Sequence, residues 1–387
     1  MSHVVEIPVG PQHPALHEPI LFRLLVEGER IVRVVPSIGY NHRGIEKLAE
    51  TNTFVKGLYI CGRVCGICNI VHATTYTMAI ERIQGVEVPP RARYLRVLVN
   101  ELERIHSHML IVAVMAEVLG FESLFMLIMR DREAVMQLKE LVTGNRVLGD
   151  YLIFGGVRRD IDDAAAHRIL RTLDHIEERV RYYRRVFEED VTINKRLRGV
   201  GPISRAEAVR YCLVGPTARG SGVETDVRAE DPYEAYGELE FNVVTYPDGD
   251  SWSRMMVRID EILESIEIIR QVLKRLPQGQ AVPKTFKRAL PKGEAIARAE
   301  APRGELVYHV ISDGKPTPYR VKIRTPSMAN VINGIVAFKD AYIADAPAII
   351  ASFDPCISCM ERVVEVVDLD KRKSTVVSLR ELAGWRG

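Results

Sequence analysis

Two C-x-x-C pairs near opposite ends of the chain constrain its fold more than any other feature. The first is Cys65 and Cys68 in "RVCGICNIVH", and the second is Cys356 and Cys359 in "DPCISCMER". Four-cysteine zinc sites usually place their pairs about 15 to 20 residues apart, so these pairs do not make a local zinc loop. If they bind one metal, the fold has to bring distant segments together around it. That arrangement suits a catalytic metal better than a structural one.

The segment after the first pair predicts how its thiols behave. Residues 69–83 are predicted to form a helix, so His72 follows Cys68 by one turn on the same face. Thiols at a helix N-terminus have lowered pKa values and bind soft metals as thiolates. His72 is then a fifth ligand, a hydrogen-bond donor to a cysteine sulfur, or a core histidine. Cys61, one turn before Cys65, is predicted to be a buried thiol; the alternative is a residue near the metal that tunes or replaces a ligand.

The composition is that of an ordinary soluble protein. Of 387 residues, 47% are hydrophobic, and 53 basic against 51 acidic residues leave a net charge of +2, so we expect no nucleic-acid partner. The longest apolar runs, residues 109–116 and 124–129, are much shorter than the roughly 20 residues that span a bilayer. No signal peptide opens the sequence. We therefore expect a chain on the cytosolic side that meets a membrane only through partners.

Hydrophobic periodicity predicts a mainly helical fold. One buried helix face is marked by apolar residues at spacings of three and four, namely Leu95, Leu98, Leu102, Ile105 and Met109. Further helices are predicted over residues 122–141, 162–187 and 253–276. Residues 199–250, rich in glycine and proline, are predicted to be mostly structured loop.

These patterns predict an α+β fold, mainly α with β additions, in a single domain over residues 1–387. Its predicted regions are an N-terminal β region (1–44), a helical core (45–280), a β-rich insertion (281–325), a helix with the second cysteine motif (326–362) and a C-terminal hairpin (363–387).

The two cysteine motifs resemble the signature motifs of nickel–iron hydrogenase large subunits, R-x-C-G-x-C-x-x-x-H and D-P-C-x-x-C-x-x-H/R. Segments such as "GPQHPALHEP", "GYNHRGIEKLAE", "ELERIHSHML" and "EAPRGEL" resemble the energy-converting, membrane-bound (group 4) hydrogenases. The same segments resemble the quinone-site subunit of respiratory complex I, which has generally lost the four cysteines. Because all four are kept here, the hydrogenase branch is favoured. The resemblance implies a helical bundle with an N-terminal β hairpin and small β elements near the C-terminus.

The resemblance also implies a division of roles among the cysteines. Cys65 and Cys356 would be terminal ligands of nickel. Cys68 and Cys359 would bridge nickel to an iron that carries carbon monoxide and cyanide. Four thiolates make an electron-rich, soft nickel, as heterolytic splitting of dihydrogen requires. His72 would hydrogen-bond a bridging thiolate.

Residues that move or steer protons are assigned by the same resemblance. Cys356 would take the proton first and pass it to Glu18, whose alternative interpretation is a solvated loop acid. Arg303 would hang over the open metal face, a task that suits an always-charged guanidinium; a surface arginine is the alternative. Pro302 and Asp354 would line the same cavity.

Several other positions leave two interpretations open. Glu46 marks either a structural magnesium site or a salt bridge. For His106 and His108, packing explains the residues as well as function does. A group of residues matches either a proton route or the quinone cavity of the complex I relatives: His13, His17, His42 and Arg43.

Electrons need a partner, because only Cys61 and Cys212 remain after the four ligands, too few for an iron–sulfur cluster in this chain. The resemblance implies a small subunit with a [4Fe–4S] cluster, ferredoxin-like subunits, integral-membrane ion-pumping subunits and ferredoxin as donor. The complex would lie at the cytoplasmic face of the membrane.

Three functions compete for this sequence. The first is a hydrogenase catalytic subunit, the second a complex I-like subunit that reduces quinone or a sulfur compound, and the third a non-catalytic zinc scaffold. Many nickel–iron large subunits are cut after the last motif residue, here Arg362. The strand-like pattern that follows favours a retained hairpin.

Overall fold

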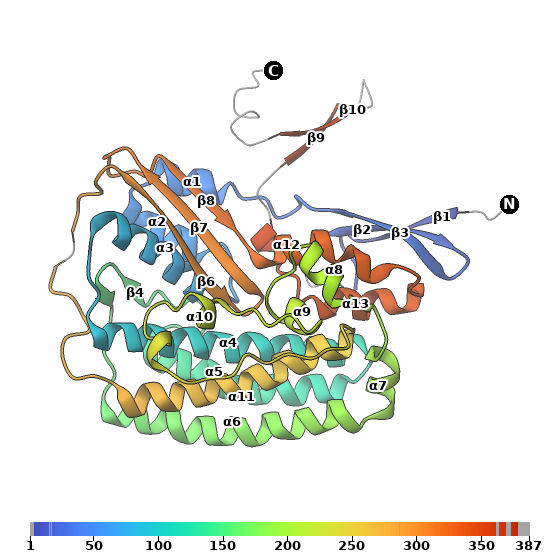
Figure 1. Ribbon diagram of the computed structural model, residues 1–387, viewed down its shortest axis with the longest axis horizontal. Helices are drawn as coiled ribbons and strands as arrows, with labels where there is room; N and C mark the ends of the chain where they lie inside the picture. Colours follow the sequence, from blue (N-terminus) through green and yellow to red (C-terminus); the bar gives the residue numbers. More distant parts are fainter. Residues whose placement is uncertain are drawn as a thin grey trace.

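The structure is a computed structural model that describes residues 4–14, 16, 18–285, 287–360, 364–368 and 373–377, with only the backbone of 332, 333 and the last two ranges. One side of the molecule, the lower side in Figure 1, is a bundle of four long helices that lie side by side. These are α4 (Pro90–Val118), α5 (Glu122–Thr143), α6 (Asp163–Glu189) and α11 (Ser251–Arg275). The predicted α+β class is confirmed.

Local signals explain where these helices begin and end. Pro90 occupies the first turn of α4, where its missing N–H costs no hydrogen bond. Asp162 and Asp250 cap α6 and α11 by accepting backbone N–H groups. Gly144 ends α5 in the left-handed conformation. The predicted buried face of α4 is confirmed, since its five apolar side chains are at most 1% exposed.

Buried arginines tie α4 to its surroundings. The side chain of Arg96 pairs with Glu81 at 2.7 Å and with Glu234 at 2.9 Å, and all three side chains are buried. Replacing Arg96 by methionine is expected to lower the free energy of unfolding by about 3–5 kcal/mol, because two carboxylates lose their buried partner. Arg181→Met, which breaks an exposed pair with Glu177 on α6, is expected to cost less than about 1 kcal/mol. Urea unfolding of both variants checks this, and equal effects would contradict it.

A three-stranded antiparallel sheet of β6 (Gly293–Ala301), β7 (Gly304–Ser312) and β8 (Arg320–Arg324) covers the N-terminal helices. Along β7 buried and half-buried residues alternate, as expected for a sheet with one face on the core. Strands β6 and β7 pack on α3 (Asn69–Gln84). The segment predicted as an insertion is thus packed into the core (Figure 1).

A second sheet lies at the other end of the molecule and consists of β1 (Val4–Val9), β2 (Leu21–Glu27) and β3 (Arg30–Ser37). The expected hairpin is the β2–β3 pair, to which β1 adds a third strand. Phe22 of β2 contacts Phe338 with ring centroids 6.1 Å apart, so the sheet packs on the segment before the second cysteine motif.

Two stretches differ from the prediction. Residues 199–250 contain short helices α8 (Arg205–Arg210), α9 (Gly215–Arg219), α10 (Val227–Glu230) and η1 (Tyr236–Glu238), because Ser204 and Asp226 supply N-caps inside a glycine-rich segment. After α12 (Pro326–Asn333), the predicted helix continues only as the turns η2 (Gly334–Phe338) and η3 (Ile343–Asp345).

The remaining elements are short. They are α1 (Ile45–Thr51), α2 (Phe54–Gly62), β4 (Leu152–Ile153), β5 (Gly156–Val157), α7 (Val191–Leu197), α13 (Ala346–Ser352), α14 (Ile357–Met360), β9 (Val364–Asp368) and β10 (Lys373–Val377). Strands β9 and β10 pair antiparallel, as predicted for the C-terminal hairpin. Arg362, after which many nickel–iron large subunits are cut, lies outside the described residues.

Candidate metal centre

The two cysteine pairs meet in the interior of the molecule. The sulfur atoms of Cys65 and Cys356 lie 3.2 Å apart, and those of Cys68 and Cys359 lie 3.8 Å apart. All four thiols are free and at most 3% exposed. A metal with sulfur bonds of about 2.3 Å holds tetrahedral sulfur neighbours about 3.8 Å apart. The sulfurs of Cys65, Cys68 and Cys359 all lie within 4.8 Å of one another, and Cys356 adds a fourth sulfur beside that of Cys65. The fold thus assembles a thiol donor set suited to a soft metal.

Backbone contacts hold each pair in place. The N–H groups of Ile67 and Cys68 point at the sulfur of Cys65, at 3.2 and 3.4 Å. Such N–H···S bonds stabilise a thiolate. In the second pair, the N–H of Cys356 donates to Ser327 Oγ and the carbonyl of Cys359 accepts from Thr325 Oγ1. The beginning of α12 therefore fixes the second motif.

Arg43 connects the two halves of the site. Its guanidinium donates to the carbonyl oxygens of Arg63 at 2.9 Å and Val64 at 2.7 Å, just before Cys65. A longer contact of 3.4 Å reaches the carbonyl of Ser358 in the second motif. Arg43 thus has a structural role between the motifs, and its predicted place on a proton route stays a prediction.

Four neighbouring buried thiols cannot all ionise without a cation. Hydrogen bonds with the thiols of Cys356, Cys359 and Cys68 lower the pKa of Cys65 well below its usual value. For Cys68, hydrogen bonds with Cys356, Cys359 and Cys65, together with burial, raise the pKa well above the usual value of a thiol. One thiolate therefore opposes the ionisation of the next, and a soft metal cation removes this conflict. The donor set fits the nickel and iron that the family motifs imply.

A buried carboxylate supports the helix that follows the first pair. Glu103 of α4 accepts the N–H groups of Ile70 and Val71, both at 2.8 Å. Burial raises its pKa to about 7, although Lys139 lowers it. Lys139 is itself buried and donates to the carbonyl of Val147. Nothing local in the sequence marks Glu103 or Lys139, because α4 and α5 bring them to α3 only in the folded chain.

Arg303 occupies the tight turn that joins β6 and β7. Residues Ala301 and Gly304 pair, so Pro302 and Arg303 alone form the turn. Gly304 lies against Gly215. A Cβ added to Gly215 would lie only 2.3 Å from the Cα of Gly304. Gly215 and Gly304 also have positive φ angles of 62° and 125°, which favour glycine. These two glycines let the loop before α9 hold the hairpin in place.

The guanidinium of Arg303 points into the interior and binds Asp354. It donates to the Asp354 carbonyl at 2.8 Å, to its Oδ1 at 2.7 Å and to Ser107 Oγ at 3.2 Å. Burial alone would lower the pKa of Arg303, but Asp354 and the thiol of Cys356 raise it well above its usual value. Burial raises the pKa of Asp354 despite its arginine partner. The surface-arginine alternative is thereby wrong.

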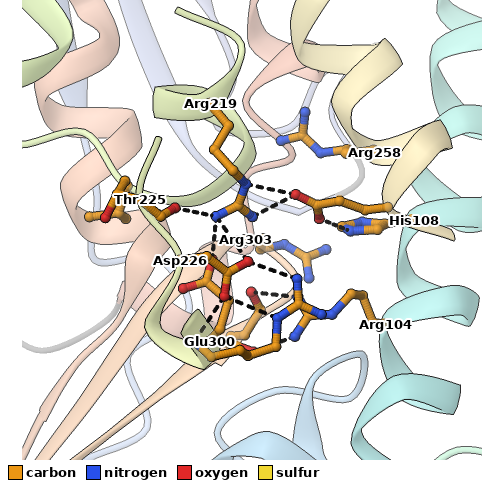
Figure 2. Close-up of polar contacts among 12 residues, drawn as sticks. Arg104, His108, Arg219, Thr225, Asp226, Arg258, Glu300 and Arg303 are labelled. Atoms are coloured by element: carbon orange, nitrogen blue, oxygen red, sulfur yellow. Dashed lines mark hydrogen bonds and ion pairs between the residues drawn. The ribbon is translucent and has the colours of Figure 1, made fainter. Parts of the chain in front are cut away.

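A buried ion-pair network lies behind Arg303 (Figure 2). Glu261 of α11 accepts from Arg219 at 2.7 Å and from His108 Nε2 at 2.8 Å. Arg219 also donates to Glu300 Oε1 at 2.9 Å, near the end of β6. Burial opposes the charge on Glu261, but Arg219 and His108 lower its pKa. The network therefore anchors the strand that leads into the Arg303 turn.

Glu18 reaches the second motif from the loop before β2. Its carboxylate accepts the N–H groups of Ile357 and Ser358 and, at 2.6 Å, the hydroxyl of Ser358. It also lines a cavity of about 170 Å³ together with Arg303 and Asp354. The rest of the cavity wall is mostly apolar. Glu18 is thus half-buried beside Cys356, unlike a solvated loop acid.

His72 lies against the sulfur of Cys359. Its Nε2 is 3.6 Å from that sulfur, and its Nδ1 is 2.7 Å from the hydroxyl of Tyr308 on β7. His72 is 1% exposed. This contact supports the predicted hydrogen bond to a thiolate. Tyr308 itself has no signal in the sequence.

Other predicted residues have local partners. Glu46 accepts from the N–H of Ile323 and pairs with Arg320 at 3.1 Å, as the salt-bridge interpretation predicts, and the structural magnesium site near it stays a prediction. His106 Nε2 lies 2.9 Å from the carbonyl oxygen of Ile67, which stands between Cys65 and Cys68. His13 and His42 lie in the N-terminal loops, and His17 lies outside the described residues.

Comparisons with known proteins agree with this geometry. Residues 119–292 and 283–362 match the family described as respiratory-chain NADH dehydrogenase, 49 Kd subunit. Residues 43–116 match the family of nickel-dependent hydrogenases. The chain is 44% identical to the carbon monoxide-induced hydrogenase of Rhodospirillum rubrum over 92% of this chain and 99% of the relative. It is 39% identical to the membrane-bound hydrogenase subunit alpha of Pyrococcus furiosus over 99% and 93%.

A solved structure shows the same fold. A chain of the membrane-bound sulfane sulfur reductase, an archaeal respiratory membrane complex, superposes with a TM-score of 0.88 and 34% identity, covering 93% of this chain and 98% of that one. The fold, the four-thiol site and the sequence matches agree. The chain is an oxidoreductase-family protein that belongs to the family joining the large subunits of nickel-dependent hydrogenases with the 49 kDa subunit of respiratory-chain NADH dehydrogenase.

Proposed function

We propose that this chain is the catalytic large subunit of a membrane-bound, energy-converting [NiFe] hydrogenase, which interconverts protons, electrons and dihydrogen. The observation that carries the proposal is the assembly of four free, buried thiols in two close pairs beside Arg303. Cys65 and Cys356 would hold nickel, and Cys68 and Cys359 would join it to an iron with carbon monoxide and cyanide ligands. When bound, this group supplies heterolytic cleavage of dihydrogen.

The protein residues handle charge and protons around that group. Arg303, held by Asp354, keeps a fixed positive charge at the site, where a preorganised guanidinium needs no rearrangement during the reaction. Cys356 would take a proton on its sulfur. Glu18 would accept it and release it along the N-terminal loop; its contact with the residue directly after Cys356 supports this role. The walls of the cavity are mostly apolar, which limits the water around the site.

The size of the cavity favours a small substrate. It measures about 170 Å³ and is lined mostly by apolar side chains such as Ile67, Leu110 and Val114. Pockets for drug-sized organic ligands measure about 300–1,000 Å³, whereas an apolar cavity of about 150 Å³ binds benzene or xenon. Dihydrogen fits this cavity, which supports the hydrogenase proposal.

The relatives support a membrane complex as the setting. Two of them are named as membrane-bound, and the second of these, the sulfane sulfur reductase, is described as a respiratory membrane complex. Among the described residues, no helix is long and apolar enough to cross a bilayer. We propose that a small subunit with a [4Fe–4S] cluster, ferredoxin-like subunits and membrane ion-pumping subunits complete the complex at the cytoplasmic face, with ferredoxin as donor.

A second candidate function is reduction of a sulfur compound without a nickel–iron centre. The observation that favours it is the 34% identity and TM-score of 0.88 with the sulfane sulfur reductase chain. Both candidates share the fold, so only the content and ligands of the site separate them.

Metal analysis and infrared spectroscopy of the isolated complex test the proposal. We expect one nickel and one iron atom per chain, with infrared bands of carbon monoxide and cyanide on iron. Because no protein group absorbs at the wavenumbers of metal-bound carbon monoxide and cyanide, the bands identify the iron ligands directly. Zinc in place of nickel and iron, or a complex without these bands, would overturn the hydrogenase assignment and favour the zinc scaffold or the sulfur reductase.

A further inference from the structure

Tyr308 makes a contact that none of the assigned roles uses. Its hydroxyl lies 2.7 Å from His72 Nδ1, and the opposite ring nitrogen of His72 lies 3.6 Å from Cys359 Sγ. Both side chains are at most 1% exposed. The two rings meet edge to face, with centroids 5.8 Å apart and an interplanar angle of 76°. Hydroxyl, imidazole and sulfur thus form one continuous hydrogen-bonded line from β7 to the metal site.

The protonation pattern along this line follows from the chemistry of its ends. A cysteine sulfur bound to a metal is a thiolate and can only accept a hydrogen bond. His72 Nε2 must then carry the proton. In a neutral imidazole the other nitrogen is an acceptor, so Nδ1 accepts from the Tyr308 hydroxyl.

We propose that Tyr308 is a positioning residue of the metal centre, which sets the tautomer and ring orientation of His72 and so secures the N–H···S bond to Cys359. The inference rests on the proposed nickel–iron function. Without the hydroxyl, the tautomer with hydrogen on Nδ1 becomes accessible, and it offers Cys359 no donor. The bond matters because hydrogen bonds to a ligand sulfur draw charge from it and tune the metal.

Tyr308→Phe tests the proposal in the whole complex. The variant keeps the ring and its packing but removes the hydroxyl. We expect nickel and iron contents like those of the wild type, and carbon monoxide and cyanide bands shifted to lower wavenumber, because a more electron-rich sulfur increases back-donation from iron. The midpoint potential of the infrared-detected states should fall as well.

Tyr76→Phe is the matched control. Tyr76 is equally buried, and its ring meets that of Tyr308 with centroids 6.2 Å apart. Its hydroxyl, however, donates to the carbonyl of Phe54 at 3.1 Å and not to His72. We expect its bands at the wild-type positions. The proposal would be overturned if Tyr308→Phe had its bands at the wild-type wavenumbers, or if the bands of both variants shifted by the same amount.

A double variant tests whether Tyr308 acts through His72. Glutamine at position 72 carries an N–H donor that needs no tautomer, so adding Tyr308→Phe to His72→Gln should cause no further shift. A shift as large as in the wild-type background would overturn the proposed route. If Tyr308→Phe fails to assemble, 3,5-difluorotyrosine at position 308 decides the matter: its stronger donor should move the bands to higher wavenumber, and unmoved bands would contradict the proposal.

Failure of this inference and failure of the proposed function give different results. A wild-type complex without carbon monoxide and cyanide bands overturns the function and the inference together. A wild-type complex with these bands and an unshifted Tyr308→Phe variant overturns the inference alone.

Discussion

Replacing Cys356 by serine is expected to abolish hydrogen evolution, with a loss of about 10⁴-fold or more, the scale on which catalytic units fail when one member is removed. Serine is nearly isosteric, but its hydroxyl is a hard, weakly acidic donor that binds soft nickel poorly. The sulfur of Cys356 also lies 3.2 Å from the sulfur of Cys65, so Cys356 is part of the proposed donor set. The measurement is hydrogen evolution, with nickel content determined in the same preparation.

Cys61→Ser is the control for this experiment. Cys61 is also completely buried, and it lies in the last turn of α2 just before the first motif. The proposed ligand set leaves it out, so we expect nickel content and hydrogen evolution within a few-fold of the wild type. Wild-type activity in Cys356→Ser would refute its role as a nickel ligand. Loss of nickel in Cys61→Ser would show that the ligand set is assigned wrongly.

Replacing Glu18 by glutamine is expected to slow proton exchange by about 10²–10⁴-fold, the usual contribution of a positioned acid–base group. Glutamine keeps the length of the side chain and an oxygen that accepts the N–H groups of Ile357 and Ser358. It cannot take up a proton from Cys356. The metal content should therefore stay unchanged while exchange of deuterium gas with water slows.

Two further variants bracket the effect. Glu18→Asp keeps a titratable carboxyl at the wrong distance and should show an intermediate rate. Glu6→Gln removes an exposed carboxylate of β1 in the same region and should leave the rate unchanged. Normal exchange in Glu18→Gln would mean that another group carries the proton away from Cys356.

The helical part of the fold was predictable because its signals are local. Apolar residues three and four apart marked the buried face of α4, and Pro90, Asp162 and Asp250 mark helix starts by their own chemistry. The short helices between residues 199 and 250 escaped prediction. There, glycine and proline dominate the composition and hide caps such as Ser204. Likewise, residues 281–325 were predicted to be β-rich, but the packing of β6 and β7 on α3 was not predicted.

The side chains to which we assign the chemistry could be picked out from the sequence alone. Two C-x-x-C pairs, a glutamate before proline and an arginine after proline were recognisable because short motifs keep their residue types and spacing. Only the tertiary structure decided how they meet: Cys65 beside Cys356, Arg303 on Asp354, and Tyr308 behind His72. The physical reason is that these contacts join elements far apart in the chain. Their distances depend on how α3, the β6–β7 hairpin and the loop before α14 pack, and no local pattern records that packing.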